Sequence, residues 1–239
     1  MSSNGIILVA TKEEAYYNSA IMCANSILEY MPDANITLFT TPELYKKYHR
    51  SLFDSVNLET PNEYRGKLWG MANTPYELTL YMDCDMLVQH DEFNLIFDLI
   101  GSNDMVWTKI TAEREYAYNN EGGSNRIFPG GEFKIHGGLC LYNSLCKKFM
   151  SDWYNLDKKI RDNKWWPNIK LYPTRFKSWD QFSLWWLTEK EWDNYRYLKY
   201  GFFEDDFRWN WLHTYDSVKE GGNNHGKEPI ILHHNWIKR

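Results

Sequence analysis

Apolar segments of strand length alternate with segments of helical spacing through about the first hundred residues of this chain. Gly5 to Thr11 has the continuous apolar character of a buried strand, and Glu13 to Tyr30 carries apolar residues at helical spacing. Alternation of this kind is typical of an α/β fold, in which helices cover both faces of a mostly parallel sheet. The sequence therefore predicts a Rossmann-like central sheet.

The other predicted elements follow from the same periodicities and from the positions of proline. In the first half they are a strand at Asn35 to Thr40, a helix opened by Pro42 at Glu43 to Tyr48, a strand at Ser55 to Leu58, a helix from Arg65 that ends before Pro75, and a strand at Leu78 to Met82. In the second half they are helices at Asp91 to Ile100, Ser144 to about Lys164 and Trp179 to Glu189, with strands at Met105 to Ile110, Gly138 to Tyr142 and Ile230 to Leu232. Ala112 to Gly131 is polar, Gly-rich and without periodicity, and such long irregular segments are usually functional or mobile.

Length and charge limit the classes of protein. The chain has 239 residues without a visible linker or repeat, which suits a single domain over residues 1–239. The formal net charge is -5, and Lys and Arg are scattered rather than gathered into a basic stripe. We therefore expect no nucleic-acid partner.

Cysteine usage and the N-terminus bear on the compartment. The cysteines Cys23, Cys84, Cys140 and Cys146 have neither metal-ligand spacing nor the pattern of a disulfide framework, so free thiols in a reducing compartment are expected. The N-terminus lacks a charged n-region, and its apolar stretch at Ile6 to Ala10 is too short for a signal peptide or a membrane span. We expect a soluble, cytoplasmic protein without a transmembrane segment.

Two carboxylates one residue apart follow the predicted strand Leu78 to Met82. Side chains at i and i+2 of an extended segment point the same way, so Asp83 and Asp85 can present oxygens to one hard divalent cation. An Asp-x-Asp pair also occurs by chance and often marks only a turn. An idle pair of charges directly after a buried strand is costly, however, and the pair therefore predicts a metal site.

Five landmarks occur in order along nearly the whole chain. They are the segment Val9 to Tyr17, Lys67 sixteen residues before Asp83, the segment Tyr81 to Val88 with Phe93 to Leu99 after it, the small-residue segment His136 to Asn143, and Trp179 to Gln181 together with His233 to Trp236. In this order they resemble glycosyltransferase family 8, the glycogenin-like group of GT-A glycosyltransferases, and the related nucleotide-diphospho-sugar transferase family with its C-terminal His-x-Asn-Trp.

The resemblance implies a GT-A fold and a hexosyltransferase-type enzyme. Such an enzyme moves a sugar from a nucleotide-diphosphate sugar, here expected to be a UDP-sugar, to a glycan, glycolipid or protein acceptor, with retention of configuration. It also implies a nucleotide-binding half over residues 1–100 and a donor-sugar and acceptor half over residues 101–239.

Several residues match the family's nucleotide-binding positions. The backbone at Ala10 and Thr11 and the ring of Tyr16 match the groups that hold the base, and Tyr17 is the alternative ring. Lys67 matches a basic residue that reaches the diphosphate or the sugar. Lys238 is a second candidate for the diphosphate, although the family's usual Lys-containing ending is here reduced to Lys238 and Arg239.

The metal and its ligands follow from the acidic pair. Asp83, Asp85 and one imidazole form a ligand set that favours Mn²⁺, with Mg²⁺ able to substitute. Cys84, which stands between the two aspartates, is a candidate for binding the donor. We assign the imidazole to His233 because it ends the last predicted strand. His234 is the alternative, since neighbours in an extended segment face opposite ways, and a purely structural histidine is the alternative for either ring.

Three further groups of residues have candidate roles at the transferred sugar and the acceptor. Asp180 and Gln181 match the family's Asp-Gln beside the anomeric carbon, where positive charge develops; the alternative is helix capping after Ser178. Gly137 and Gly138, which with His136 replace the commoner Asn-Ser-Gly, allow close approach of the backbone to the donor sugar or form a β-bulge. The Trp residues of three short segments are candidates for the acceptor side, although a Trp pair within a helix is more often core: Trp165 to Pro167, Trp185 with Trp186, and Trp209 to Trp211.

Two other function classes stay open. A nucleotide-sugar phosphohydrolase or nucleotidyltransferase would also use an acidic pair, but it usually has a Gly-rich basic loop near the first strand, and Val9 to Glu14 is not such a loop. A non-catalytic sugar-binding module would account for the 17 Tyr and 12 Trp residues. It would not need Asp83, Asp85 and Lys67.

Overall fold

The structure is a computed structural model, and it describes residues 3–109, 127–128, 131–132, 135–164, 180–212 and 228–233. The strands of the central sheet are β1 (Asn4–Val9), β2 (Ile36–Phe39), β3 (Ser55–Asn57), β4 (Leu78–Met82), β6 (Met105–Lys109), β9 (Ile135–Asn143) and β10 (Tyr200–Phe202). The other strands are β5 (Met86–Val88), β7 (Ile127–Phe128), β8 (Gly131–Glu132), β11 (Trp211–Leu212) and β12 (Ile231–His233). The α-helices are α1 (Glu14–Tyr30), α2 (Gly66–Ala72), α4 (Lys147–Arg161), α5 (Asp180–Glu189) and α6 (Asp206–Trp209), and the 3-10 helices are η1 (Lys47–Leu52), η2 (Asp91–Ile100), η3 (Ser144–Cys146) and η5 (Trp192–Tyr195).

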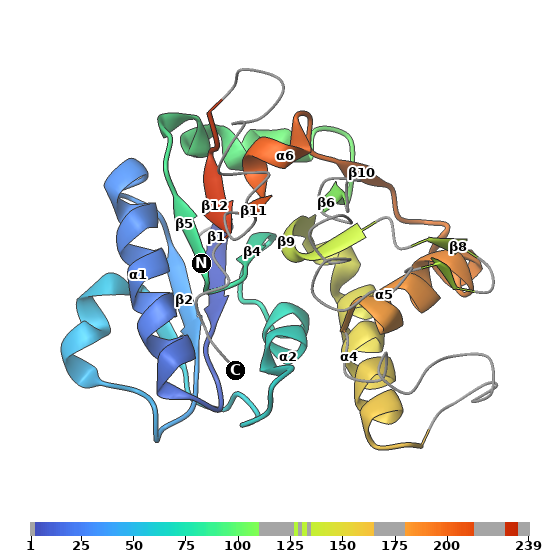
Figure 1. Ribbon diagram of the computed structural model, residues 1–239, viewed down its shortest axis with the longest axis horizontal. Coiled ribbons are helices and arrows are strands. Elements are labelled where there is room, and N and C mark those ends of the chain that lie inside the picture. The colour runs from blue at the N-terminus through green and yellow to red at the C-terminus, as the bar shows by residue number, and fades with distance from the viewer. Residues whose placement is uncertain are drawn as a thin grey trace.

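The central sheet has the order β10-β6-β9-β4-β1-β2-β3 (Figure 1). Strand β1 pairs in parallel with β2 and β4, β2 with β3, and β10 with β6. Strand β9 runs antiparallel to both of its neighbours, β4 and β6. The predicted α/β fold with a mostly parallel sheet is confirmed.

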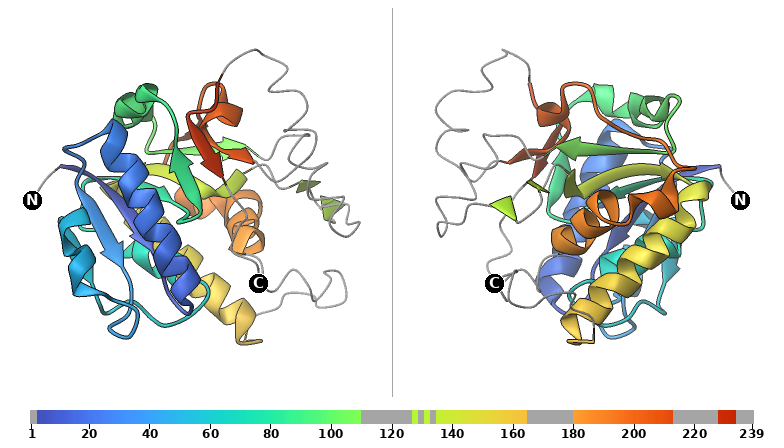
Figure 2. Two further views of the ribbon diagram at one scale, coloured as in Figure 1. Left: turned by 60° about the vertical axis from the view of Figure 1, so that its left-hand side comes forward. Right: turned by 90° about the vertical axis from the view of Figure 1, so that its right-hand side faces the viewer.

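Helices cover both faces of this sheet because both faces of its central strands are apolar. Along β1, Ile6 and Leu8 belong to a core that includes residues of α1, whereas Ile7 and Val9 belong to a second core with residues of α2, α4 and α5. Figure 2 shows α1 on one side of the sheet and α4 and α5 on the other. The unbroken apolar run of the first strand therefore reflects burial on two sides.

The topology brings three segments to one edge of the sheet. Strands β1 and β4 are parallel neighbours, with Ile6 opposite Leu80, so the chain segments that follow their carboxyl ends meet. A small sheet of order β11-β12-β5 stands at the same edge, and in it His233 is in register with Met86. The C-terminal strand β12 is therefore next to the acidic pair that precedes β5.

Two helix predictions were wrong in detail. The segment Glu43 to Tyr48 is not one helix: residues 42–44 form a turn and η1 begins at Lys47. Lys46 has extended dihedral angles (φ -112°, ψ 112°), which a continuous helix cannot contain. The predicted helix Asp91 to Ile100 exists but is a 3-10 helix throughout.

Part of the irregular segment Ala112 to Gly131 falls within the described residues, namely β7 and the first residue of β8, which pair antiparallel. The rest of that segment lies outside them. Among the described helices, none has the length and apolar character needed to cross a bilayer.

Candidate active site

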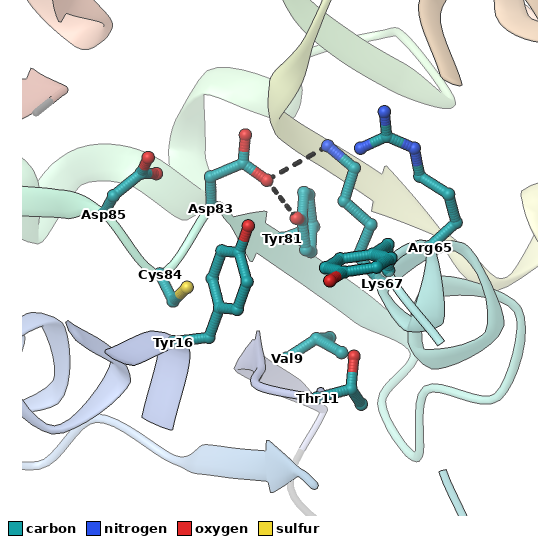
Figure 3. A pocket seen from close by; sticks show the side chains of 10 residues that line it. Val9, Thr11, Tyr16, Arg65, Lys67, Tyr81, Asp83, Cys84 and Asp85 are labelled. Atoms are coloured by element: carbon teal, nitrogen blue, oxygen red, sulfur yellow. Dashed lines mark hydrogen bonds and ion pairs between the residues drawn. The ribbon is translucent and has the colours of Figure 1, made fainter. Parts of the chain in front are cut away.

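An open pocket lies at the carboxyl ends of β1 and β4 (Figure 3). Ligands of open α/β sheets usually bind at this edge. The lining residues all come from the first hundred residues of the chain: Val9, Thr11, Tyr16, Tyr64, Arg65, Lys67, Tyr81, Asp83, Cys84 and Asp85. The pocket thus contains six of the predicted site residues, together with Tyr64 and Arg65, which the sequence did not single out.

Asp83, Asp85 and His233 each offer a ligand atom, and these atoms all lie within 4.8 Å of one another. The two aspartates come close together for a different reason from the extended arrangement that the sequence suggested. The two aspartates do not extend β4, since Met86 N–H donates to the Asp83 carbonyl at 3.2 Å and closes a turn over Cys84 and Asp85. The turn leads into β5, whose pairing with β12 brings His233 Nε2 to 3.3 Å from Asp85 Oδ1.

The two carboxylates differ in electrostatic environment. Burial alone would raise the pKa of Asp85, but His233 in its protonated form, a backbone hydrogen bond and Lys67 together hold that pKa below its usual value. Burial raises the pKa of Asp83 above its usual value, even though Lys67 Nζ lies 3.1 Å from Asp83 Oδ1 and the Tyr81 hydroxyl donates to the same oxygen. A cation placed between the carboxylates would compensate both of these half-buried charges.

Asp180 lies at the start of α5 and joins the same charge cluster. Its Oδ2 is 2.7 Å from Lys67 Nζ, and its Oδ1 is 3.5 Å from an Arg65 guanidinium nitrogen. Burial alone would raise the pKa of Asp180, but Arg65 and Lys67 outweigh it and hold the pKa well below its usual value. Asp180 is thus an ionised, buried carboxylate that shares Lys67 with Asp83, and Gln181 is half-buried. Neither of the two is among the residues that line the pocket.

The glycine pair forms an irregularity in β9. The pairing with β6 shifts from Trp107 opposite Cys140 to Thr108 opposite His136, so residues 137–139, which include Gly137 and Gly138, lie in a bulge or irregularity of β9. A Cβ on Gly138 would lie 2.8 Å from Asp83 Oδ2 and 2.8 Å from the His136 ring. The small residue at 138 therefore makes room for the acidic pair itself.

The residues predicted to hold the nucleotide base differ in their environments. The Tyr16 side chain is half-buried and points from α1 into the pocket (Figure 3). Tyr17, the alternative ring, is fully buried and its hydroxyl accepts from the Lys46 N–H at 3.1 Å, so it is not a stacking platform for a ligand. Ala10 is fully buried, and the Thr11 hydroxyl donates to the Glu63 carbonyl at 2.6 Å.

Cys84 and two of the aromatic candidates for the acceptor side are buried. Burial and the two neighbouring aspartates raise the pKa of the Cys84 thiol well above its usual value, which makes it a poor ligand. The four cysteines are buried and free, as predicted. Trp185 is buried, and Trp209 is buried and stacked on Phe203, so these two rings belong to the core, whereas Trp186 and Trp211 are half-buried.

Some predicted site residues lie outside the described residues. These are Lys238, His234, the segment Trp165 to Pro167, and Trp179 beside Asp180. Conversely, Tyr64 and Arg65 line the pocket and were not predicted. Arg65 had a signal in the sequence, since it stands two residues before Lys67 at the start of the same helix.

No protein-family model and no curated protein matches the chain. Its fold is nevertheless shared with solved glycosyltransferase structures. The glycosyltransferase GlyE of Streptococcus pneumoniae superposes with a TM-score of 0.60 at 16% identity, over 96% of this chain and 54% of that one. The galactosyltransferase LgtC, solved with donor and acceptor sugar analogues, gives a TM-score of 0.57 at 16% identity, over 97% of this chain and 87% of that one.

A mouse enzyme, xyloside xylosyltransferase 1, matches over 99% of both chains with a TM-score of 0.53 at 11% identity. The present chain spans about half the length of GlyE, at 54% of that chain. At these identities the likeness establishes the fold, and the expectation of a GT-A fold is confirmed.

Proposed function

We propose that this protein is a metal-dependent glycosyltransferase that moves a sugar from a nucleotide-diphosphate sugar to an acceptor. The observation that carries the proposal is the convergence of His233 on Asp83 and Asp85, two aspartates that line an open pocket together with Lys67. The pocket lies at the ligand-binding edge of a sheet whose fold is that of solved glycosyltransferases.

The ligand set fits a hard divalent cation. Two carboxylates and one imidazole suit Mn²⁺, and Mg²⁺ can substitute. When bound, such an ion acts as a Lewis acid that neutralises negative charge on a leaving diphosphate. The 3.3 Å separation of His233 Nε2 and Asp85 Oδ1 supports this fit, because two acceptor atoms face each other favourably only with a proton or a cation between them.

The chain's own cations would complement the ion. Lys67 and Arg65 line the pocket beside the acidic pair and can stabilise further charge on the diphosphate. The pocket residues come from the first half of the chain, which supports assigning the nucleotide to residues 1–100, and a UDP-sugar is the proposed donor. Residues 101–239 contribute His233 and Asp180, and we assign the donor sugar and the acceptor to that half.

Transfer is proposed to proceed with retention, with Asp180 as the carboxylate that stabilises positive charge at the anomeric carbon. Two cations hold Asp180 in its ionised form, which suits charge stabilisation better than proton transfer. An α-linked product from an α-linked donor, seen in the NMR coupling at the new anomeric centre, is expected. A β-linked product would remove this role from Asp180.

A thermal-shift screen tests the donor class. Nucleotide sugars, the matching nucleoside diphosphates and free sugars are added to the protein, with Mn²⁺ and with a chelator. A nucleotide sugar should raise the melting temperature with Mn²⁺ and not with the chelator, because a ligand that binds only the folded state stabilises it. A shift with free sugars alone would favour a sugar-binding module, and equal shifts with the chelator would contradict metal dependence.

A further inference from the structure

One buried amide joins four separate parts of the fold beneath the candidate metal site. Asn210, which follows α6, is fully buried. Its Oδ1 lies 2.8 Å from His233 Nδ1, and its Nδ2 lies 2.9 Å from His136 Nδ1 and 3.1 Å from Thr108 Oγ1. The two imidazoles also pack edge to face, with ring centroids 5.5 Å apart.

The direction of each hydrogen bond follows from one backbone group. The Gly138 N–H lies 3.2 Å from His136 Nδ1 and can only donate, so His136 Nδ1 is an acceptor. The Asn210 group that faces the same nitrogen must then be its NH₂, and the amide oxygen faces His233. His233 Nδ1 therefore carries a proton and donates it to Asn210, and in the neutral ring Nε2 is the unprotonated nitrogen.

We propose that Asn210, itself oriented by His136 and the Gly138 N–H, is a positioning residue that fixes the tautomer of His233 so that Nε2 presents its lone pair to the metal. This inference rests on the proposed metal site. Nε2 is the nitrogen that belongs to the cluster with Asp85 and Asp83. Ring nitrogens opposite to a metal-ligating nitrogen commonly donate to such an outer partner, which orients the ring.

The arrangement also gives His136 a function. His136 occupies the position of the Asn in the commoner Asn-Ser-Gly of the families that this chain resembles. Its side chain is only 3% exposed. Its Nδ1 accepts from both Gly138 N–H and Asn210, so the ring holds the amide that holds His233. The bulge at Gly138 therefore serves the metal site twice, by making room for Asp83 and by setting the direction of the hydrogen bonds.

Metal binding without donor gives the first test. The Mn²⁺ dissociation constant is measured by the EPR signal of free Mn²⁺ for wild type, Asn210→Leu, Asn210→Asp and His136→Phe. Asn210→Leu should weaken binding by about 10–100-fold, the usual effect of losing an outer partner. Asn210→Asp keeps an acceptor for His233 and should lose less. Thr108→Val removes one of the two partners of the Asn210 NH₂ but leaves His136, and it should therefore also weaken binding less than Asn210→Leu.

Two site variants separate the failure of this inference from failure of the proposed function. If His233→Ala and Asp85→Asn lose Mn²⁺ but folded Asn210→Leu binds it like wild type, the positioning role is overturned and the metal site stands. If His233→Ala and Asp85→Asn also bind Mn²⁺ like wild type, the metal site itself is wrong and the inference falls with it.

The wild-type protein loaded with Mg²⁺ provides a second readout. Imidazole ¹⁵N spectra of this diamagnetic complex report which nitrogen of each ring carries hydrogen. His233 should be protonated at Nδ1 and His136 at Nε2, with the His136→Phe spectrum assigning the signals. The opposite tautomer in either ring would overturn the proposal.

Discussion

Tyr16 is the pocket side chain whose exposure best suits contact with a nucleobase, because it is half-buried in α1 and its ring reaches the open pocket. Stacking of a base on an aromatic ring contributes about 1–3 kcal/mol. We predict that Tyr16→Ala weakens donor binding by about this amount, whereas Tyr16→Phe, which keeps the ring, is nearly neutral. Isothermal titration of the donor found in the screen measures both.

Tyr64 supplies the matched comparison. Tyr64 is 61% exposed and lines the same pocket. Lys12 Nζ lies over its ring, 5.6 Å from the ring centroid. If Tyr16→Ala binds the donor like wild type and Tyr64→Ala loses affinity, the base stacks on Tyr64 and the assignment of Tyr16 is wrong.

At this scale the sequence predicted residues whose chemistry is unusual for their position. Asp83 and Asp85 directly follow one apolar strand, and His233 ends another. These three residues could be predicted because polar or charged side chains stand out in an apolar stretch of sequence. Asn210 lies in the segment Trp209 to Trp211, which was singled out only for its Trp residues. The role proposed for Asn210 arises from contacts with residues 23 and 74 positions away in the chain. Contacts between residues so far apart in the chain depend on how the strands are arranged in the sheets. They cannot be read from the pattern of a single sequence.

At the scale of elements, the bulge in β9 is the part of the site most sensitive to a single methyl group. A Cβ at Gly138 would meet Asp83 Oδ2 at 2.8 Å, whereas a Cβ at Gly137 would meet its nearest atom, in Trp153, at 3.4 Å. We predict that Gly138→Ala lowers the free energy of unfolding by about 1–3 kcal/mol and weakens Mn²⁺ binding, because Asp83 must move. Urea denaturation and the EPR titration measure the two effects.

Gly137→Ala is the control for this prediction and should stay near wild type in both measurements. Equal behaviour of the two variants would mean that the close approach of β9 to Asp83 does not matter. Loss of stability in Gly138→Ala with unchanged metal binding would mean that the bulge serves folding alone.

The elements that the sequence predicted best are those buried on both faces. β1, β2 and β4 appear within about two residues of their predicted bounds, since continuous apolar runs of strand length have few alternatives. Short strands were missed: β10 and β11 have 3 and 2 residues, and their pairing is decided by neighbours distant in sequence. Local pattern also could not distinguish a 3-10 helix from an α-helix at Asp91–Ile100.

At the scale of the whole molecule, Asp180 joins the two halves of the chain through buried ion pairs with Arg65 and Lys67. Removing one partner of a buried pair leaves uncompensated charge and costs about 3–5 kcal/mol. We predict that Asp180→Asn lowers the free energy of unfolding by about this amount at neutral pH. Asp162→Asn, which removes an aspartate paired with Lys164 at the surface, is the control and should change stability little.

The effect of Asp180 should depend on pH in one direction. Its pKa in the folded protein lies below its unfolded value of about 3.9 because Arg65 and Lys67 outweigh the effect of burial. The stabilisation is therefore present above that value and is lost as pH falls through the folded pKa. The difference in unfolding free energy between wild type and Asp180→Asn should shrink as pH is lowered below about 4. A difference that does not vary with pH would contradict the ion-pair account.

Donor turnover under metal control tests the central claim most directly. The protein is stripped of metal, and release of the nucleoside diphosphate from the donor is followed as Mn²⁺ is added back. We predict that wild type is inactive without metal and recovers with Mn²⁺, while Asp83→Ala and Asp85→Ala stay inactive at every Mn²⁺ concentration yet remain folded by circular dichroism. Undiminished turnover in either variant, or full activity in the stripped wild type, would contradict a metal-dependent glycosyltransferase built on this acidic pair.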